Sequence, residues 1–505
     1  MRARRSWVVG AAVITALTGC GSTVVQGGSA LQPGGVVPPA TGSDGLGDDP
    51  LATTAMPDGR SSTTTYADGP STAVVAAPNP TAPSGAPDSA SSNATVPAGG
   101  GGAVGGPLVV GFVTQKDLER TGSAVGLTGI ATGDTENQMR AITADINARG
   151  GVLGRRISLV SHDIRTSEAT TNPDQSAFRT CESLAEQKAA VVVNAGQHPS
   201  LLSCLAKHGI VLIDSTGIRS SAASFEKHGN LLFSPSAMSL DRYLPAVVDR
   251  LAAQGFFRSW DMRAGDPGTA PVRIGVQAFD NEQGRHYVAL LDKALRRYGF
   301  RVDERDLHST DVGENASATS AAVLRFAARG VTHVFNANVL FYKDAESQGY
   351  YPRYALDDTI ATPALMAENV GRPGVKGPLH GAMGAGYLPA YEVPDPKDVS
   401  AAATRCKQLM TKAGEDLSKS LTLVLVLHVC DAMTFLDAAM EAGGELSGAG
   451  MQRGLGSLRG YESTVTYEGR PTSTNHAGAT RIRDFVYDDA CGCFAFPSTS
   501  THEVR

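Results

Sequence analysis

Seven polar side chains that can hydrogen-bond a small molecule stand in loops that follow apolar, strand-like runs. Amide, hydroxyl and carboxylate groups hold polar molecules by donating and accepting hydrogen bonds, and a carboxylate can also pair with a positive group. The candidate ligand-binding residues are Gln115, Gln197, Ser215, Thr216, Gln283, Asn338 and Asp358. Because such residues also form turns and helix caps, a structural role is the alternative for each of them.

Signatures of catalysis are missing. The chain has no G-x-S-x-G, no H-E-x-x-H, no P-loop and no G-x-G-x-x-G after a strand. We therefore expect a binding protein that is not an enzyme and has no cofactor. Cys491 and Cys493, with Asp488 and Asp489 nearby, offer two thiols but no histidine at ligand spacing, so we expect no metal site there. A disulfide across a single residue would be strained, and the pairing of these two cysteines stays open.

The best-defined structural unit lies around residues 137–163. Met139, Ile142 and Ile146 recur at helical spacing, Gly150 and Gly151 end that helix, and residues 157–160 read as a strand. Residues 108–113 form another apolar run of strand length. Strand, helix and strand make a βαβ unit, whose crossover is expected to be right-handed.

The same alternation continues along the chain. Further strands are predicted at residues 190–193, 210–213, 272–276 and 332–335, with helices between them. This rhythm predicts doubly wound, mostly parallel sheets in an α/β fold with two lobes. A ligand would bind beyond the carboxyl ends of the strands, where the candidate residues lie.

Composition indicates an exported globular protein. The 505 residues are 42% hydrophobic with a net charge of −6 and no basic block beyond the first positions, which argues against a nucleic-acid partner. Arg2, Arg4 and Arg5 precede an apolar run at residues 7–17, which is typical of a signal peptide over residues 1–19. Residues 21–106 are rich in Gly, Ser, Thr, Pro and Ala and are expected to be a disordered tether.

Several segments resemble one family. INARGGVLGRRISLVSHD, and HVCDAMTFLDAAMEAGG followed by GLGSLRG, resemble bacterial type I periplasmic binding proteins of the branched-chain amino acid/amide-binding branch, which serve ABC importers. The resemblance covers nearly all of residues 107–498. It implies a first lobe of 107–236 and 387–478, a second lobe of 237–386 and 479–505, and three crossings between them near 234–239, 381–386 and 472–478. The apolar run 421–429 is then a buried core helix rather than a membrane span, because His428, Asp431 and Asp437 interrupt its helix.

Cysteines support export and anchoring. Leu17-Thr18-Gly19-Cys20 resembles the lipobox of bacterial lipoproteins, which implies lipidation of Cys20 and attachment to the outer face of the cell membrane; an ordinary secretion signal is the alternative. Export to an oxidising compartment favours disulfides. The resemblance implies a first-lobe bond between Cys181 and Cys204, and Cys406 could pair with Cys430 on the next helix.

The loops depart from the amino acid binders of this family. Those relatives grip the ligand's carboxylate with hydroxyl-rich segments, whereas this chain has NAGQHPS and DSTGIRS, with Ile218 about where a Thr is expected. Asp358 stands near the position of their ammonium-binding acid. We therefore expect a small polar solute, such as an amino acid, an amide or another nitrogen-containing compound. An amide, a polyamine-like or another nitrogen-containing solute is favoured over leucine, isoleucine and valine. The predicted function is that of a monomeric solute-binding lipoprotein that delivers its ligand to ABC permease subunits; a lipid-anchored ligand sensor or a scaffold without ligand is the alternative.

Overall fold

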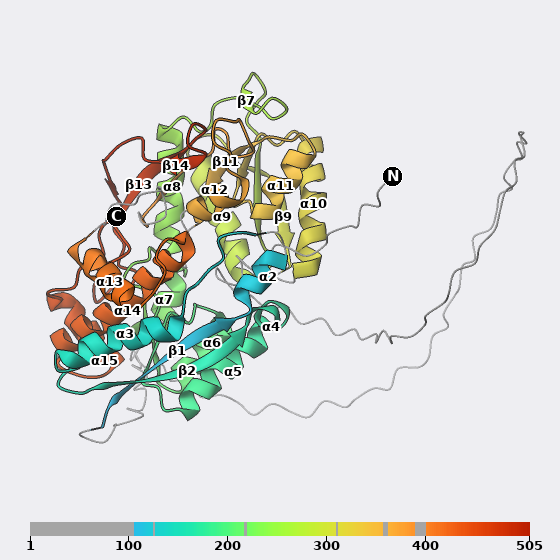
Figure 1. Cartoon of the computed structure of the whole chain (residues 1–505). Helices are drawn as coiled ribbons and strands as arrows, with labels where there is room; N and C mark the ends of the chain where they lie inside the picture. Colours follow the sequence, from blue (N-terminus) through green and yellow to red (C-terminus); the bar gives the residue numbers. More distant parts are fainter. Residues whose placement is uncertain are drawn as a thin grey trace, which may run out of the picture. The chain divides into compact units, whose positions relative to one another are not determined.

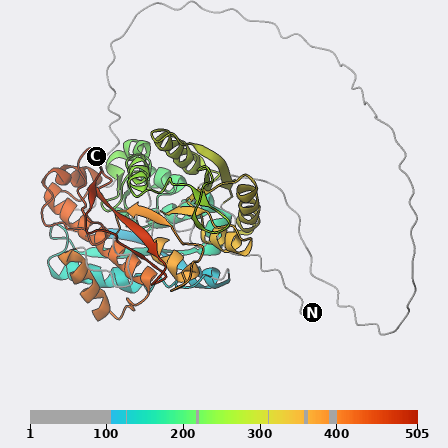
Figure 2. The ribbon, with the colours of Figure 1, turned by 90° about the horizontal axis from the view of Figure 1, so that it is seen from above.

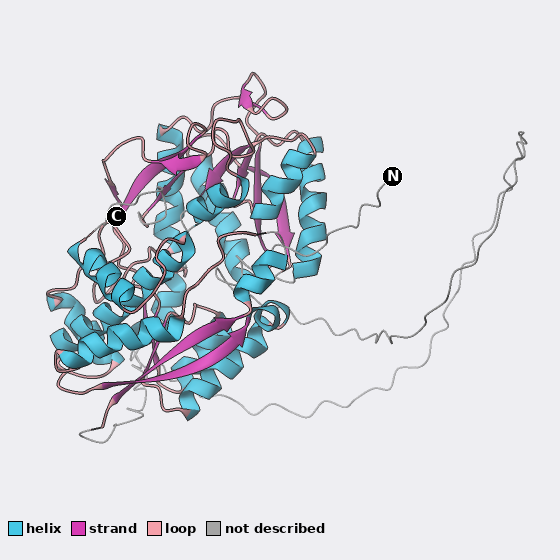
Figure 3. Ribbon diagram, in the orientation of Figure 1, coloured by secondary structure: helices cyan, strands magenta, loops and turns pink. Residues whose placement is uncertain are grey.

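The computed structural model describes residues 106–124, 127–216, 220–309, 312–356, 362–388 and 400–504 (Figure 1). The signal segment, Cys20, most of the tether, Ile218 and Asp358 lie outside the described residues. Within them the chain builds two mostly parallel sheets covered by helices (Figure 3). The expected α/β, two-lobed architecture is confirmed.

The first sheet is fully parallel and has the order β2-β1-β3-β4-β5. Its strands are β1 (Leu108–Lys116), β2 (Ile157–Arg165), β3 (Val191–Val193), β4 (Val211–Ile213) and β5 (Leu232–Phe233). Alternate side chains of β3 point to opposite faces, as strand geometry requires. Val191 and Val193 join the main core with Met139, whereas Val192 packs with Leu184 and Leu201 in a separate cluster.

Helices from both ends of the chain cover this sheet. On the Val192 side lie α5 (Pro173–Glu186), α6 (Pro199–Lys207) and α7 (Ala222–His228). On the other side α3 (Thr135–Ala148) packs against α14 (Ser420–Gly443), which also contacts α13 (Ala401–Lys412) and α15 (Gly448–Gly454). Figures 1 and 2 show these orange C-terminal helices beside the first strands. Short elements complete the region, namely α2 (Leu118–Ala124), α4 (Thr166–Thr171), η1 (Gly229–Leu231) and η3 (Leu455–Ser457).

The second sheet has the order β14-β13-β12-β11-β10-β8-β9, with β15 beside β13. Its strands are β8 (Ile274–Phe279), β9 (Val302–His308), β10 (His333–Phe335), β11 (Arg353–Leu356), β12 (Met383–Gly386), β13 (Arg481–Asp488), β14 (Cys493–Ala495) and β15 (His502–Glu503). Strands β13 to β15 join it antiparallel. The helices of this region are α8 (Leu240–Ala253), α9 (Glu282–Arg296), α10 (Val312–Ala328), α11 (Val339–Ser347) and α12 (Thr362–Val370), and β6 (Trp260–Asp261) with β7 (Asp266–Pro267) forms a small ribbon.

The chain passes between the sheets after β5, after β12 and before β13. The first and third passages lie side by side, because Ser234 N–H donates to His476 O and Gly478 N–H donates to Ser234 O. Residues 383–386, where a crossing is predicted, instead form β12, and that crossing comes after it. The exact bounds of the two lobes remain the assignment that we propose.

Helix α14 is the one described helix that is long and apolar enough to cross a membrane, and most of it is buried. Leu421, Val424, Leu427 and Phe435 on it are buried in the main core. Residues around almost its whole circumference are buried, which is why its sequence lacks an amphipathic pattern. It therefore serves as a core helix of the first lobe.

Candidate ligand-binding site

A cavity of about 140 Å³ lies beyond the carboxyl ends of β1 and β3. The chain runs from β1 to β2 on one side and then returns to β3 on the other, so these two strands flank the switch point of the sheet. Ligands of open α/β sheets bind at this kind of position. The lining comes from the ends of β1, β2 and β3, from the loops that follow β1, β3 and β4, and from helices α3 to α6 and α14.

Four buried polar atoms in this lining have no hydrogen-bond partner among the described residues. Two are acceptors, Gln115 Oε1 and Gln138 Oε1, and two belong to side chains that can donate, Asn194 Nδ2 and His198 Nε2. A buried polar atom without a partner costs about 1–3 kcal/mol, so native proteins rarely leave several together. A bound molecule with both acceptors and donors would satisfy this set.

Internal hydrogen bonds fix the direction of these atoms. Asn194 has a φ of 49°, a left-handed conformation that Asn tolerates better than most residues, and its Oδ1 accepts a 2.8 Å bond from Ser215 N–H. Because Oδ1 makes that bond, Asn194 Nδ2 can donate to a molecule in the cavity. Gln138 donates to Thr132 O at 3.1 Å and to Glu415 Oε2 at 3.0 Å, which leaves its Oε1 free to accept.

His198 supplies an uncharged donor. Its Nδ1 accepts from Ser200 N–H at 3.2 Å as the N-cap of α6, so the proton is assigned to Nε2. Burial lowers the pKa of His198 to about 4, which outweighs the opposing effect of Asp174. The nearest Asp174 oxygen is 3.8 Å from Nε2, beyond hydrogen-bond distance. The ring is therefore neutral near pH 7.

This depressed pKa predicts a pH dependence of stability. The unfolded chain takes up a proton on His198 near pH 6.5 and the folded chain only near pH 4, so the free energy of unfolding falls as the pH falls through that window. One proton corresponds to about 1.4 kcal/mol per pH unit. His198→Asn keeps a capping side chain and is expected to reduce the slope by about that amount, measured by urea unfolding at pH 6.5, 5.5 and 4.5. Equal slopes for variant and wild type would contradict the assignment.

The cavity lining is otherwise uncharged and largely apolar. The described residues that form it include no Asp, Glu, Lys or Arg. Phe112, Met139, Ile164, Leu201 and Val429 provide apolar surface. Helices α3, α5 and α6 each bring their first turn to the cavity, which adds the partial positive charge of helix N-termini. The cavity therefore suits a small uncharged group that is partly apolar and bears at least one acceptor.

Three of the seven predicted ligand-binding residues meet here, namely Gln115, Gln197 and Thr216. Gln197 is also held by its neighbours, because its Nε2 donates to Ser234 Oγ at 2.8 Å and its Oε1 accepts from Ser220. Thr216 donates to Asp214 Oδ1 at 2.7 Å. Ser215 does not line the cavity; its hydroxyl donates to the buried carboxylate of Asp431 at 2.9 Å.

The second-lobe residues do not line this cavity. Asn338 caps α11 by accepting from Phe341 N–H at 2.9 Å, and its Nδ2 lies 3.3 Å from Thr319 Oγ1. This is the structural role that was the alternative for it. Gln283 lies in the first turn of α9, and Asp358 is outside the described residues.

Three of the four lining residues with an unpaired polar atom were not among the predicted ones. Asn194 and His198 lie in the same loop as Gln197. Which of their side-chain atoms lack a hydrogen bond can be seen only in the structure. Gln138 is four residues before Ile142 on the buried face of α3. A polar residue at helical spacing within an otherwise apolar stripe is the sequence signal that could have found it.

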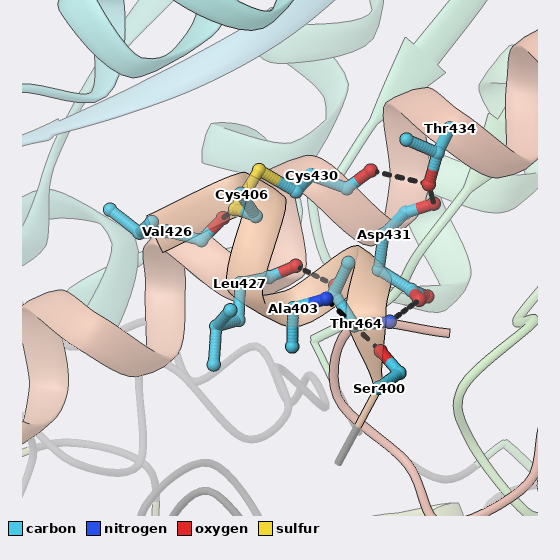
Figure 4. The surroundings of a disulfide bond; sticks show 9 residues. All are labelled: Ser400, Ala403, Cys406, Val426, Leu427, Cys430, Asp431, Thr434 and Thr464. Carbon is cyan, nitrogen blue, oxygen red and sulfur yellow. Dashed lines mark hydrogen bonds between the residues drawn. A yellow bond between two sulfur atoms is a disulfide. The ribbon is translucent and has the colours of Figure 1, made fainter. Parts of the chain in front are cut away.

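A buried hydrogen-bond network around Asp431 lies next to the cavity lining. The Asp431 carboxylate accepts hydrogen bonds from Ser215, from Ser463 Oγ at 2.8 Å, from Thr464 N–H at 3.0 Å and from Tyr461 OH at 3.1 Å. Burial raises the pKa of Asp431 despite these donors. Since Ser215 N–H in turn holds Asn194, the network connects α14 and the segment 461–464 to the cavity. Figure 4 shows Asp431 beside Thr464.

The cysteines are paired in the structure. Cys181 is bonded to Cys204 and joins α5 to α6, and Cys406 is bonded to Cys430 and joins α13 to α14 (Figure 4). These are the two pairs that the sequence suggests. Cys491 is bonded to Cys493, the pair left open by the sequence, in the turn before β14.

The segment 127–134, between α2 and α3, also contacts the second lobe. Thr128 N–H donates to Asn369 Oδ1 at 3.0 Å, and Asn369 Nδ2 donates to Thr128 O at 3.2 Å. Gly129, at a φ of 76°, approaches Glu368 so closely that a Cβ there would overlap its carboxylate. Thr132 of the same loop lines the cavity, so one segment contacts both the site and α12.

A family comparison agrees with this geometry. Residues 121–485 match the family model described as "Periplasmic binding protein". The chain belongs to the periplasmic binding protein family. Its two-lobed fold is that of the type I periplasmic binding proteins, as its sequence motifs predict. Family members bind solutes and are not enzymes, so this periplasmic binding protein is not an enzyme.

Solved structures share the fold of this periplasmic binding protein. A branched-chain amino acid ABC transporter protein from Thermus thermophilus with bound valine is 16% identical, with 79% of this chain and 97% of that chain covered and a TM-score of 0.54. A solute-binding protein from Rhodopseudomonas palustris BisB5 in complex with 3,4-dihydroxybenzoic acid is 12% identical, with 79% and 98% covered and a TM-score of 0.55. A substrate-binding periplasmic protein from Ralstonia solanacearum is 15% identical, with 77% and 99% covered and a TM-score of 0.53. No curated protein sequence matches the chain.

Proposed function

We propose that this protein captures a small polar solute at the carboxyl edge of its first sheet and delivers it to the permease of an ABC importer. The observation that carries the proposal is the set of four buried, unpaired polar atoms in one cavity at the switch point. The two-lobed family fold supports it, because lobes that close over a solute hold it for release at a membrane partner. The membrane permease is the expected partner, and a monomer is the expected state.

We infer that the part of the solute in the cavity is uncharged. A charged group there would meet no opposite charge among the described lining residues, and burying an unpaired charge is costly. An apolar cavity of about 150 Å³ holds a benzene-sized molecule, so about 140 Å³ suits an amide or a small nitrogen-containing ring. Leucine, isoleucine and valine are expected to bind weakly. A positive group elsewhere on the solute would need an acid such as Asp358.

A ligand screen tests this proposal. Thermal unfolding of the purified protein is followed with acetamide, benzamide, putrescine, L-valine and 4-hydroxybenzoate, and the compounds that raise the melting temperature are titrated by calorimetry. We expect a neutral amide to bind more tightly than L-valine. Tight binding of L-valine with no response to amides would contradict the inferred solute class, and no response to any small solute would count against a binding function.

Anchoring is proposed on the sequence of the signal segment. Cys20→Ala is expected to abolish lipidation and to move the protein from the membrane fraction to the soluble fraction, since a diacylated N-terminus holds a protein stably on a bilayer. Fractionation followed by mass spectrometry of the N-terminal peptide measures both effects. Unchanged membrane retention of the variant would exclude the lipoprotein assignment.

Delivery is a separate claim from binding. Uptake of the best ligand by cells that lack this protein is expected to fall and to recover when the wild-type gene is restored. Full uptake without the protein would favour the sensor function instead, since a sensor binds the same solute without carrying it to a permease.

A further inference from the structure

Two side chains of types that can ligate a metal ion lie beside the disulfide that joins α5 to α6. They are Glu182 on α5 and His208 at the end of α6, and with Cys181 and Cys204 they form one group. Their potential ligand atoms all lie within 4.8 Å of one another. His208 Nε2 is 3.4 Å from Glu182 Oε1, and the same carboxylate oxygen is 3.4 Å from Cys204 Sγ.

We propose that reduction of the Cys181–Cys204 bond converts this group into a tetrahedral site for Zn²⁺. Two thiolates, one imidazole nitrogen and one carboxylate oxygen are four ligands of the types that Zn²⁺ binds in proteins. Cys204 and His208 are one helical turn apart on α6, and Cys181 and Glu182 are adjacent on α5, so two rigid elements supply two ligands each. The cation would also lie near the C-terminal end of α6, which favours positive charge.

The chemistry is balanced by an external dithiol. The dithiol gives two electrons and two protons to the disulfide and becomes a disulfide itself, which leaves two cysteine thiols. Binding of Zn²⁺ then releases these two protons, because thiolates are the metal ligands. The two sulfur atoms must separate to roughly 3.8 Å, the distance set by tetrahedral Zn–S bonds of about 2.3 Å.

The surrounding packing supports such a change without loss of the fold. Both cysteines are buried, and Leu184, Leu201 and Leu205 lie in the same smaller apolar cluster, so α5 and α6 also pack through apolar side chains. Side chains of Glu182 and His208 are 40% and 39% exposed, so one side of the group is open to solvent for the entering ion. The same two helices line the ligand cavity with Ala177 and Leu201, so the metal would replace the disulfide as the cross-link beside the solute site.

Cobalt binding tests the site directly. The purified protein is reduced with dithiol, freed of it under argon and titrated with Co²⁺, which reports thiolate ligation by a charge-transfer band, and then with Zn²⁺, which displaces it. We expect binding to the reduced protein and none to the oxidised protein. His208→Ala and Glu182→Gln are expected to weaken binding by at least about tenfold. Glu186→Gln, one turn further along α5 and exposed, is the matched control and should bind as the wild type does.

Two further results decide the interpretation. The other cysteine pairs are also reduced, so equal cobalt binding by the wild type and both ligand variants would place the ion elsewhere and overturn the proposal. If reduction unfolds the protein, Zn²⁺ must restore a thermal transition in the wild type but not in His208→Ala, and failure to do so also overturns it. The oxidised ligand variants keep the disulfide, and their circular dichroism checks that the substitutions themselves leave the fold intact.

Discussion

Replacing Asp431 with leucine is expected to destabilise the domain by about 3–5 kcal/mol, as the loss of one partner from a buried network does. The carboxylate is completely buried and accepts hydrogen bonds from Ser215, Tyr461, Ser463 and Thr464. Leucine has the same branched shape, although it is larger, and it accepts none of these hydrogen bonds, so the donors would remain buried without partners. Urea unfolding followed by circular dichroism measures the change.

Two companion variants identify the cause. Asp431→Asn keeps one carbonyl oxygen for Ser463 and Thr464 and is expected to cost less than leucine. Asp437→Asn, on the same helix, removes a 3.2 Å ion pair with the half-exposed Arg149 and is expected to cost at most about 1 kcal/mol. A loss for Asp431→Leu no larger than that of Asp437→Asn would show that the network contributes little.

The second large effect is expected at Gln115. Gln115→Leu keeps the approximate volume of the side chain but removes an acceptor, Oε1, that has no partner among the described residues. In the presence of the solute this loss leaves a donor of the ligand unpaired, which costs about 1–3 kcal/mol, or roughly 5- to 150-fold in affinity. Calorimetry with the best ligand of the screen measures it.

The same variant, Gln115→Leu, is expected to keep or increase its stability to urea in the absence of ligand. Without ligand, removal of a buried unpaired oxygen relieves a desolvation cost, so Gln115→Leu should unfold at the same or a higher urea concentration than the wild type. Gln408→Leu, at an exposed position of α13, is the matched control and should change affinity little. Equal affinities of Gln115→Leu and wild type would remove Gln115 from the site.

The order of strands and helices was readable from the sequence because it depends on local spacing. The Met139, Ile142 and Ile146 stripe and the glycine pair after it gave α3 and its end, and Gly151 indeed has a φ of 76°. Parallel strands joined by helices place the loops after β1, β3 and β4 at one edge of the sheet, so Gln115, Gln197 and Thr216 could be expected together. The Cys406–Cys430 pair followed from consecutive helices, whereas the Cys181–Cys204 pair was implied by the resemblance to related binding proteins.

Only tertiary contacts decided which polar atoms of the site remain without a hydrogen-bond partner and can bind a ligand. Gln138 turns its Oε1 toward the cavity because Glu415, 277 residues away, takes its amide group, and no local pattern contains that pairing. The Ser215 hydroxyl donates to Asp431 and does not line the cavity. The Asn338 side chain accepts from the first turn of α11 and donates to Thr319. Sequence spacing determined where polar side chains gather, because strand and helix periodicity are local. Which polar atoms stay unpaired depends on hydrogen bonds between distant segments, because a polar group buried by folding is satisfied by whichever partner the packed chain brings to it. The neutral state of His198 depends on its burial, which is also decided by the packed chain.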